Sequence, residues 1–362
     1  MYFDPRPKTK KEDLFNRETE LKQFEEVLPY ASIIVVTGLR RTGKTSFVDV
    51  ALSKTDHPYI FLDMRDLPLG PSRAEIVRKI ESAFGKMDTK WHSSILDTLK
   101  HVKGVNIAGA SMTFEWSKQG IDLTELFDKI DTWAKKQKKH FLLAIDEVQL
   151  IRGDKNIPRL FARIADVNRN ITIILTGSEV GLLYDFLGFE TPESPLYGRH
   201  YVEIRMRNFK PEEAKTFLTA GFKQIKLSCT DEIIDYAIQK LDGVIGWLTL
   251  FGARSRDTKK CDKQTVDDVV DEGGRLSRSE ALKIVKYSVR YGIILNYLAK
   301  TGKGNWTKIK TALEIDEKRS LPSSSFTELL NRLTKTGLLE KEDNEYRIAD
   351  PLLAHGIMRE PF

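Results

Sequence analysis

A glycine-rich loop carries the clearest chemical signal in this chain. The segment from Gly38 to Thr45 has the pattern G-x-x-x-x-G-K-T and follows the apolar stretch 31–37 directly. Glycine tolerates positive φ, so the backbone of such a loop can wrap a phosphate chain with its N–H groups pointing inward. The loop predicts a nucleotide-binding site, in which Lys44 supplies a charge for the β- and γ-phosphates and Thr45 a hydroxyl for Mg²⁺. The expected nucleotide contacts are Gly38, Arg40, Arg41, Thr42, Gly43, Lys44, Thr45 and Ser46.

Two adjacent carboxylates, Asp146 and Glu147, end the near-continuous apolar run that begins at His140. Such a run is typical of a strand covered on both faces, and open α/β folds bind ligands at the carboxyl ends of their strands. Asp146 would hold Mg²⁺ there through water, while Glu147 would polarise a water molecule in line with the γ-phosphate. A residue that activates water favours hydrolysis over phosphoryl transfer to a second substrate.

Three further positions have weaker signals. Ser178, or less favourably Thr176, could contact the γ-phosphate or the attacking water, although Ser and Gly also open ordinary loops. Arg199 could stabilise γ-phosphate charge as an arginine finger, in cis or from a neighbouring subunit. A surface ion pair is the competing interpretation for Arg199. Arg40 and Arg41 could face solvent or a partner instead of the nucleotide.

The elements that must position these residues alternate between strands and helices, which predicts an α/β fold around a central parallel sheet. The segment ahead of the first strand puts Leu21, Phe24 and Val27 on one helical face, and we expect a lid helix there. Residues 105–116 predict a short hairpin or edge ribbon. Strands are expected at 31–37, 58–63, 140–146, 171–176 and 201–205, and helices at 72–86, 92–101, 122–138 and 157–167.

From Pro211 the periodicity becomes purely helical, with helices expected from Pro211, at 230–241 and at 244–254. The last segment predicts a winged helix-turn-helix, with helices at 293–298, 306–313 and 324–336 and a hairpin around Asp343 and Asn344. Gly337 would end the recognition helix. The expected domains are a P-loop domain at 1–207 that includes the lid helix, a helical lid domain at 208–281 and a winged-helix domain at 282–362.

Composition restricts the class of protein to which the chain can belong. The chain has 362 residues, of which 41% are hydrophobic and 30% charged, as in ordinary globular proteins. No apolar run reaches the roughly 18 residues that cross a bilayer, so we expect a cytoplasmic protein without membrane contact. Cys229 and Cys261 are isolated, which argues against a disulfide framework or a C-x-x-C metal site. The six histidines show no metal-ligand spacing.

The chain resembles the archaeal ATPase branch of the STAND class of P-loop NTPases, which is related to the AAA+ proteins. This resemblance covers nearly the whole chain and implies ATP as the nucleotide, Mg²⁺ as the metal and hydrolysis as a conformational switch. It also places Phe15 and Arg17 among the nucleotide contacts. The matching stretches contain Phe15, Arg17, Glu18, Glu20 and Leu21; Gly38 to Thr45; Phe61, Asp63 and Arg65; Leu143 to Gln149; Leu175 to Ser178; and Pro195 to Arg199.

The lid departs from the family pattern. Members of the family often have Gly-x-Pro where this chain has Gly243-Val-Ile-Gly246-Trp247, so the proline that would touch the nucleotide is missing. The missing proline leaves the role of this segment in nucleotide sensing open, and Trp247 could simply belong to the core.

Three interpretations of the carboxy-terminal part stay open. The chain could be an ATP-driven switch, or a DNA-binding AAA+ ATPase of the origin-recognition or remodelling type, or its winged helix could bind a protein partner or a second copy of the chain. Residues 275–362 contain 16 Lys and Arg against 11 Asp and Glu, which fits either a nucleic-acid footprint or a solvated basic face. Arg332 and Lys335 on the recognition helix are the candidate contacts with double-stranded DNA.

Overall fold

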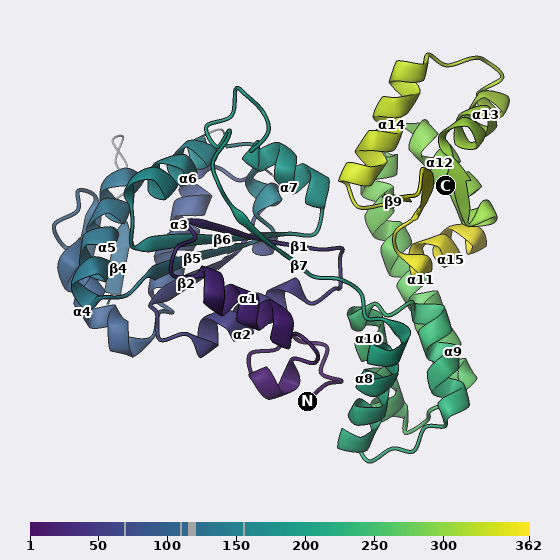
Figure 1. The fold of residues 1–362 in the computed structure, drawn as a ribbon, viewed down its shortest axis with the longest axis horizontal. Coiled ribbons are helices and arrows are strands. Elements are labelled where there is room, and N and C mark those ends of the chain that lie inside the picture. The colour runs from purple at the N-terminus through teal and green to yellow at the C-terminus, as the bar shows by residue number, and fades with distance from the viewer. Residues whose placement is uncertain (69, 109–110, 115–120, 155) are drawn as a thin grey trace.

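The chain folds into two lobes, which lie side by side in Figure 1. The computed structural model describes residues 1–68, 70–108, 111–114, 121–154 and 156–362. One lobe contains a five-stranded sheet and the helices that cover it. The other contains a group of helices with a small three-stranded sheet at one end.

The five predicted strands form one fully parallel sheet, which confirms the predicted α/β architecture. The strand order is β2-β5-β6-β1-β7, so β6 separates the strand before the phosphate loop from the strand that ends in the two carboxylates. Parallel pairing brings the carboxyl ends of all five strands to one edge, where Thr37 lies opposite Gly177 and Asp63 opposite Asp146. The strands are β1 Ile33–Thr37, β2 Tyr59–Asp63, β5 Phe141–Asp146, β6 Ile171–Gly177 and β7 Val202–Arg205.

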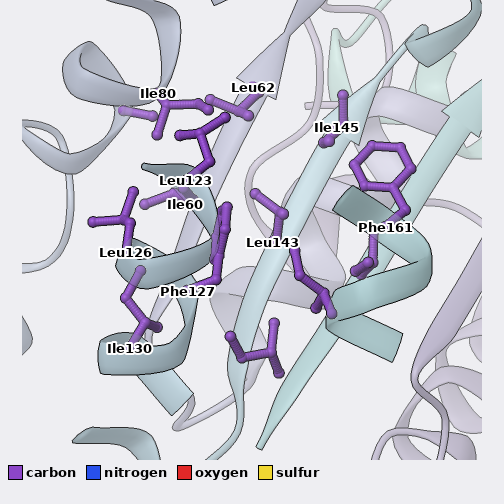
Figure 2. Packing of buried hydrophobic residues seen from close by; sticks show 14 of the residues in the cluster. Ile60, Leu62, Ile80, Leu123, Leu126, Phe127, Ile130, Leu143, Ile145 and Phe161 are labelled. Carbon is purple, nitrogen blue, oxygen red and sulfur yellow. The ribbon is translucent and has the colours of Figure 1, made fainter. Parts of the chain in front are cut away.

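Both faces of this sheet are buried, because alternate side chains of each central strand enter different cores. Ile33 and Val35 pack on one face, and Ile34 and Val36 on the other. Figure 2 shows the first core, where Phe127 of helix α5 lies beside Leu143 of β5. The two-sided burial explains why these strands are continuous apolar runs and holds their carboxyl ends in a fixed position.

Seven α-helices accompany the sheet in the described part of this lobe. The predicted lid helix, α1, packs with Leu21, Phe24 and Val27 against the sheet and α2, so it is not a lid over the loop. The predicted hairpin is present as β3 Val105–Ala108 and β4 Ser111–Phe114, while Glu115 and Trp116 lie outside the described residues. The helices are α1 Glu18–Val27, α2 Lys44–Lys54, α3 Arg73–Phe84, α4 Thr89–Leu99, α5 Leu123–Gln137, α6 Asn156–Val167 and α7 Val180–Leu187.

Four helices form the helical half of the second lobe. They are α8 Pro211–Gln224, α9 Asp231–Leu241, α10 Ile245–Thr258 and the first part of α11 Lys263–Val285. The amino terminus is anchored in this half, because the ring of Phe3 fills the space that a side chain at Gly221 or Gly252 would occupy. Cys229 and Cys261 form a disulfide there, with Cα atoms 5.4 Å apart. The expectation that the two cysteines stay isolated is wrong: the loops that precede α9 and α11 bring them together.

The predicted winged helix is present at the other end of this lobe. It contains α12 Val289–Thr301, α13 Trp306–Glu317 and α14 Ser323–Lys335, and an antiparallel sheet in the order β8-β10-β9. The strands are β8 Lys303–Asn305, β9 Leu339–Glu342 and β10 Glu345–Ile348. Gly337 follows α14 with a φ of 71°, as a helix-ending glycine should.

Two helices connect the halves of the second lobe. Helix α11 runs without a break through residue 281, where the boundary between the lid and winged-helix domains was predicted. The last helix, α15 Pro351–Arg359, returns along α11, and Gly356 backbone lies against Gly274. No helix in the described part of the chain is long and apolar enough to span a bilayer.

Candidate nucleotide-binding site

The phosphate loop leaves β1 and enters α2 as predicted. Gly38 and Gly43 have φ values of 145° and 90°, in the region that side chains disfavour. A side chain at Gly38 would also overlap the carbonyl of Met206. Both the backbone conformation and the lack of space therefore require glycine at this position. The loop thus has the backbone conformation that turns successive N–H groups toward an anion.

Lys44 is buried at the start of α2 and folds back over the loop. Its Nζ donates hydrogen bonds to the carbonyls of Gly38 and Leu39, at 2.9 and 2.8 Å. Burial lowers the pKa of Lys44 to about 8, although Glu147 and Asp146 act in the opposite direction. The ammonium group is therefore at the loop, held by carbonyl oxygens that an incoming phosphate can replace.

Asp146 and Thr45 meet as predicted for a magnesium site. Thr45 Oγ1 donates to Asp146 Oδ2 at 2.8 Å, and the hydroxyl of Thr176 donates to the other carboxylate oxygen. Burial raises the pKa of Asp146, whose side chain has 0% exposure. No cluster of three or more His, Cys, Asp or Glu in the described chain could hold a metal alone. The oxygen pair nevertheless fits Mg²⁺, which usually takes one or two protein ligands and completes its shell with phosphate and water.

Glu147 is held at the same edge by donors on two elements. Its Oε2 accepts hydrogen bonds from Gln149 Nε2 at 2.6 Å, from Ser178 N at 3.0 Å and from Ser178 Oγ at 2.9 Å. Its backbone φ of 55° is left-handed, which turns the side chain out of the strand. Burial alone would raise the pKa of Glu147, but Lys44 and these hydrogen bonds outweigh it and lower that pKa. The carboxylate is thus ionised and oriented.

The structure changes the interpretation of the residues after β6. The Ser178 hydroxyl donates to Glu147 and the buried Thr176 hydroxyl donates to Asp146, so both orient a carboxylate, and a contact with the γ-phosphate or the attacking water stays a prediction. Gln149 is a site residue that the sequence analysis did not single out. Its only signal was its place in the segment that begins with Asp146 and Glu147.

One cavity of about 560 Å³ at the junction of the two lobes is lined by Lys44, Thr45, Glu147, Gln149 and Ser178, while Asp146 is fully buried beside Thr45. Phe15 lies on its wall in edge contact with Phe209 and Phe217, at ring-centroid distances of 5.7 and 5.5 Å. Arg17 is buried and donates to the carbonyls of Thr42 and Arg207, at 3.3 and 2.8 Å, so it braces the loop. Further lining residues are Pro5, Pro7, Lys8, Leu14, Arg40, Arg41, Thr42, Gly43, Ser46, Arg65, Ile245, Gly246, Trp247 and Glu280.

Arg40 and Arg41 are paired with acids of the second lobe and of α7. Arg40 lies 2.8 Å from Glu179 and 3.1 Å from Glu280 of α11. Arg41 lies 2.8 Å from the same Glu280, and its guanidinium stacks 4.2 Å from the ring centre of Trp247. Their role as nucleotide contacts stays a prediction. In the structure both arginines contact the chain's own second lobe.

Trp247 belongs to this junction as well as to the core. Its Nε1 donates to Asp350 Oδ1 at 3.2 Å, and the preceding Gly246 donates its N–H to the Arg41 carbonyl at 3.0 Å. A side chain at Gly246 would lie 2.7 Å from Arg41 Cβ, which explains the glycine. The start of α10 therefore touches the phosphate loop despite the missing proline.

Arg199 is separated from the cavity. It precedes the amino end of β7, whereas the phosphate loop follows the carboxyl end of the parallel strand β1. Its guanidinium forms two hydrogen bonds with Asp166, at 2.9 and 2.6 Å. A role as a finger in cis is therefore wrong. A role at the site of a neighbouring subunit stays a prediction, which complementation between Arg199→Ala and Glu147→Gln subunits would test.

Comparison with known proteins agrees with this geometry. A family model described as an ATPase domain predominantly from Archaea matches residues 14–249. A second model, the winged helix-turn-helix domain of MCM protein C-termini, matches residues 286–349. No curated protein is a significant match to the chain.

Two solved structures align with almost the whole chain. The Walker-type ATPase PABY2304 of Pyrococcus abyssi has 31% identity and a TM-score of 0.83, over 99% of this chain and 100% of its own. The ORC2 protein of Aeropyrum pernix, in ADPNP and ADP complexes, has 13% identity and a TM-score of 0.65, over 99% of this chain and 95% of its own. The second similarity concerns the fold alone.

Proposed function

We propose that this chain, which belongs to the family of ATPase domains found predominantly in Archaea, is a Mg²⁺-dependent ATP hydrolase whose nucleotide state controls the contact between its two lobes. One observation carries the enzymatic part. Lys44 and Thr45 of the phosphate loop line one cavity with an ionised, oriented Glu147, and Thr45 donates a hydrogen bond to the fully buried Asp146. Binding groups for a triphosphate and a group that can activate water thus lie at the same edge of the sheet, after strands β1 and β5.

Each of these side chains would have its own role in ATP binding and hydrolysis. Lys44 would exchange its two carbonyl partners for phosphate oxygens, and the loop's N–H groups would bind the same phosphates. Mg²⁺, held by Thr45 and through water by Asp146, would neutralise part of the phosphate charge. Glu147 would orient and deprotonate the attacking water. Its Oε2 is saturated by three donors, while its Oε1 accepts no hydrogen bond from any described residue and remains for water.

The apolar half of the cavity supports a nucleoside rather than a simple polyphosphate. Phe15, Leu14 and Ile245 line it next to the loop. Planar bases bind well between such aromatic and aliphatic side chains. Adenine is the expected base from the family, and the sequence contains no guanine-reading N-K-x-D segment.

Two variants test the enzymatic part. Lys44→Ala should weaken ATP binding by about 100-fold or more, because it removes the loop's phosphate-facing charge. Glu147→Gln should keep ATP affinity within about threefold and reduce hydrolysis by roughly 10²–10⁴-fold. Equilibrium binding of a fluorescent ATP analogue and single-turnover phosphate release measure the two effects. Lys54→Ala, an exposed lysine at the other end of α2, is the matched control. Normal hydrolysis by Glu147→Gln would refute the assignment of the base.

The lobe contacts support the switch. The phosphate loop binds α11 through Arg40, Arg41 and Glu280, and α7 binds the recognition helix α14 through Asp185 and Lys335 at 2.7 Å. Gly181 lies against the Lys335 backbone, where no side chain would fit. Anionic phosphates at the loop would compete with Glu280 for the two arginines. Nucleotide binding would thereby bias the position of the winged helix.

A DNA-binding AAA+ ATPase of the origin-recognition or remodelling type is the second candidate. The winged-helix match and the exposed Arg332 favour it. Against it, Lys335 is paired with Asp185, and the wing between β9 and β10 carries Glu342, Asp343 and Glu345. Anisotropy of a labelled DNA duplex at low and high salt separates the candidates. Affinity that falls with added salt supports DNA binding, whereas no binding at low salt favours a protein partner or a second copy of the chain.

A further inference from the structure

Arg65 is a cavity residue that the function described above does not use. It follows β2 and lies two residues after Asp63, whose carboxylate accepts hydrogen bonds from Arg65 Nε at 2.9 Å and Nη2 at 2.7 Å. Asp63 pairs in register with Asp146 on the adjacent strand. Arg65 Nη2 consequently lies 3.3 Å from Asp146 Oδ2, the oxygen that also accepts the Thr45 hydroxyl.

In addition to the hydroxyls of Thr45 and Thr176, the electrostatics of the site favour a cation beside Asp146. Four carboxylates are close enough to interact electrostatically with one another or with Arg65: those of Asp49, Asp63, Asp146 and Glu147. Asp146 has no exposed surface, so water does not screen it directly. A buried carboxylate is stable as an anion only with a positive or hydrogen-bonding partner. Among the described residues, Arg65 is the cation that forms an ion pair with Asp146.

Of the contacts that Arg65 forms with Asp63 and Asp146, the one with Asp146 is the weaker. Two hydrogen bonds fix the guanidinium to Asp63, and only one longer contact reaches Asp146. The side chain is 49% exposed, so it has room to withdraw toward solvent without leaving Asp63.

We propose that Arg65 is a positioning residue that acts as the counter-ion of Asp146 in the nucleotide-free site and is displaced from that carboxylate by Mg²⁺. Arg65 would then set the Mg²⁺ concentration at which the loaded site forms. This inference rests on the proposed Mg²⁺–nucleotide function and assigns a role to a residue outside the phosphate loop and the Asp146–Glu147 pair.

Binding of fluorescently labelled ADP to the full-length chain tests the proposal without turnover. At a fixed ADP concentration, R65Q should lower the Mg²⁺ concentration at the midpoint of the titration by about tenfold. The substitution removes a group that competes with Mg²⁺ for Asp146 and a positive charge that repels Mg²⁺. ADP affinity in EDTA should change by less than about threefold. The nucleotide-free chain should melt at a lower temperature than wild type, while the Mg²⁺–ADP complex should not, because Mg²⁺ then neutralises Asp146. A purely structural role would lower both melting temperatures equally.

R65M, uncharged and of similar length, is the second variant and should show the same lower midpoint. R347Q is the matched control, because Arg347 is 50% exposed and paired with Glu340 in the winged helix. An unchanged or higher midpoint in both Arg65 variants would overturn the role of Arg65, as would a large loss of ADP affinity in EDTA. Failure of wild type to bind ADP under any condition would instead refute the proposed function on which the inference rests.

Discussion

Glu147 illustrates how the catalytic candidates depend on side chains outside the recognised motifs. Its position is set by Gln149 two residues later and by Ser178 on the next strand. The Ser178 contact uses both the hydroxyl and the backbone N–H. Orientation of a general base by fixed donors is what allows it to act on a water molecule at one place. The Glu147 carboxylate and its donors therefore form one hydrogen-bonded unit, and removing a donor should lower the rate of hydrolysis.

Gln149→Met tests this at the scale of one residue. Gln149 is buried, and its Oε1 has no hydrogen-bond partner in the described structure. Methionine would remove the donor to Glu147 and also an unsatisfied oxygen, so we expect hydrolysis to fall about tenfold while the melting temperature stays equal or rises. Single-turnover rates and thermal unfolding of the same sample measure both. A large drop in melting temperature together with normal hydrolysis would contradict this assignment.

At the scale of elements, helix α11 shows tertiary packing overriding local preference. Local sequence pattern predicts no helix between Arg254 and Ile293, yet α11 continues for 23 residues through Gly273 and Gly274. Glycine is unfavourable in a helix by about 1 kcal/mol. Here the missing side chains allow α15 to approach, with Gly356 against Gly274 and Leu352 against Gly273. The packing of α15 explains why a glycine pair lies inside a continuous helix.

The disulfide is a second feature of element scale. It joins the loop before α9 to the loop before α11, across 32 residues. Closing a loop of this size should stabilise the folded chain by about 3–4 kcal/mol in the chain-entropy model. We expect C229S/C261S, and wild type under reductant, to melt several degrees below oxidised wild type.

Thermal unfolding with and without reductant measures this difference. The double variant serves as the control, because reductant should not change its melting temperature. Equal melting of oxidised and reduced wild type would show that the cysteines contribute nothing by pairing.

At the scale of the whole molecule, two groups of ion pairs add to the other contacts between the lobes. Glu280 binds the phosphate loop, and Lys335 binds α7. In Figure 1, α14 accordingly lies next to α7, although the two helices are far apart in the sequence. The nucleotide site is thus built from both lobes, which makes its occupancy and their separation interdependent.

E280Q combined with D185N should open the molecule. Each partly exposed ion pair contributes up to about 1 kcal/mol, so losing those of Glu280 and Asp185 should shift the equilibrium between closed and open lobes by about tenfold or more. Small-angle X-ray scattering of the nucleotide-free chain should then show a larger radius of gyration. E317Q, which breaks the pair with Arg290 inside the winged helix, is the control and should leave the radius unchanged. An unchanged radius in the double variant would show that these ion pairs do not hold the lobes closed.

Short-range pattern in the sequence specifies part of the fold and of the site. The strand, loop and helix around Gly38 to Thr45, the carboxylate pair at the end of β5, the five strands of the sheet and the three helices of the winged helix follow from local periodicity and from residue types at fixed spacing. These patterns place Lys44, Thr45, Asp146 and Glu147 at one sheet edge because parallel strands end together.

Only the tertiary structure decided what meets across long separations. Glu280 pairs with Arg41 from 239 residues away, and nothing near either residue encodes the other. Likewise, the direction of β7 puts Arg199 at the edge opposite the phosphate loop, and folded loops bring Cys229 to Cys261. Periodicity specifies which face of an element is buried, but the partner of an exposed charge depends on how whole elements pack. That packing makes two arginines of the phosphate loop a link between the loop and the second lobe.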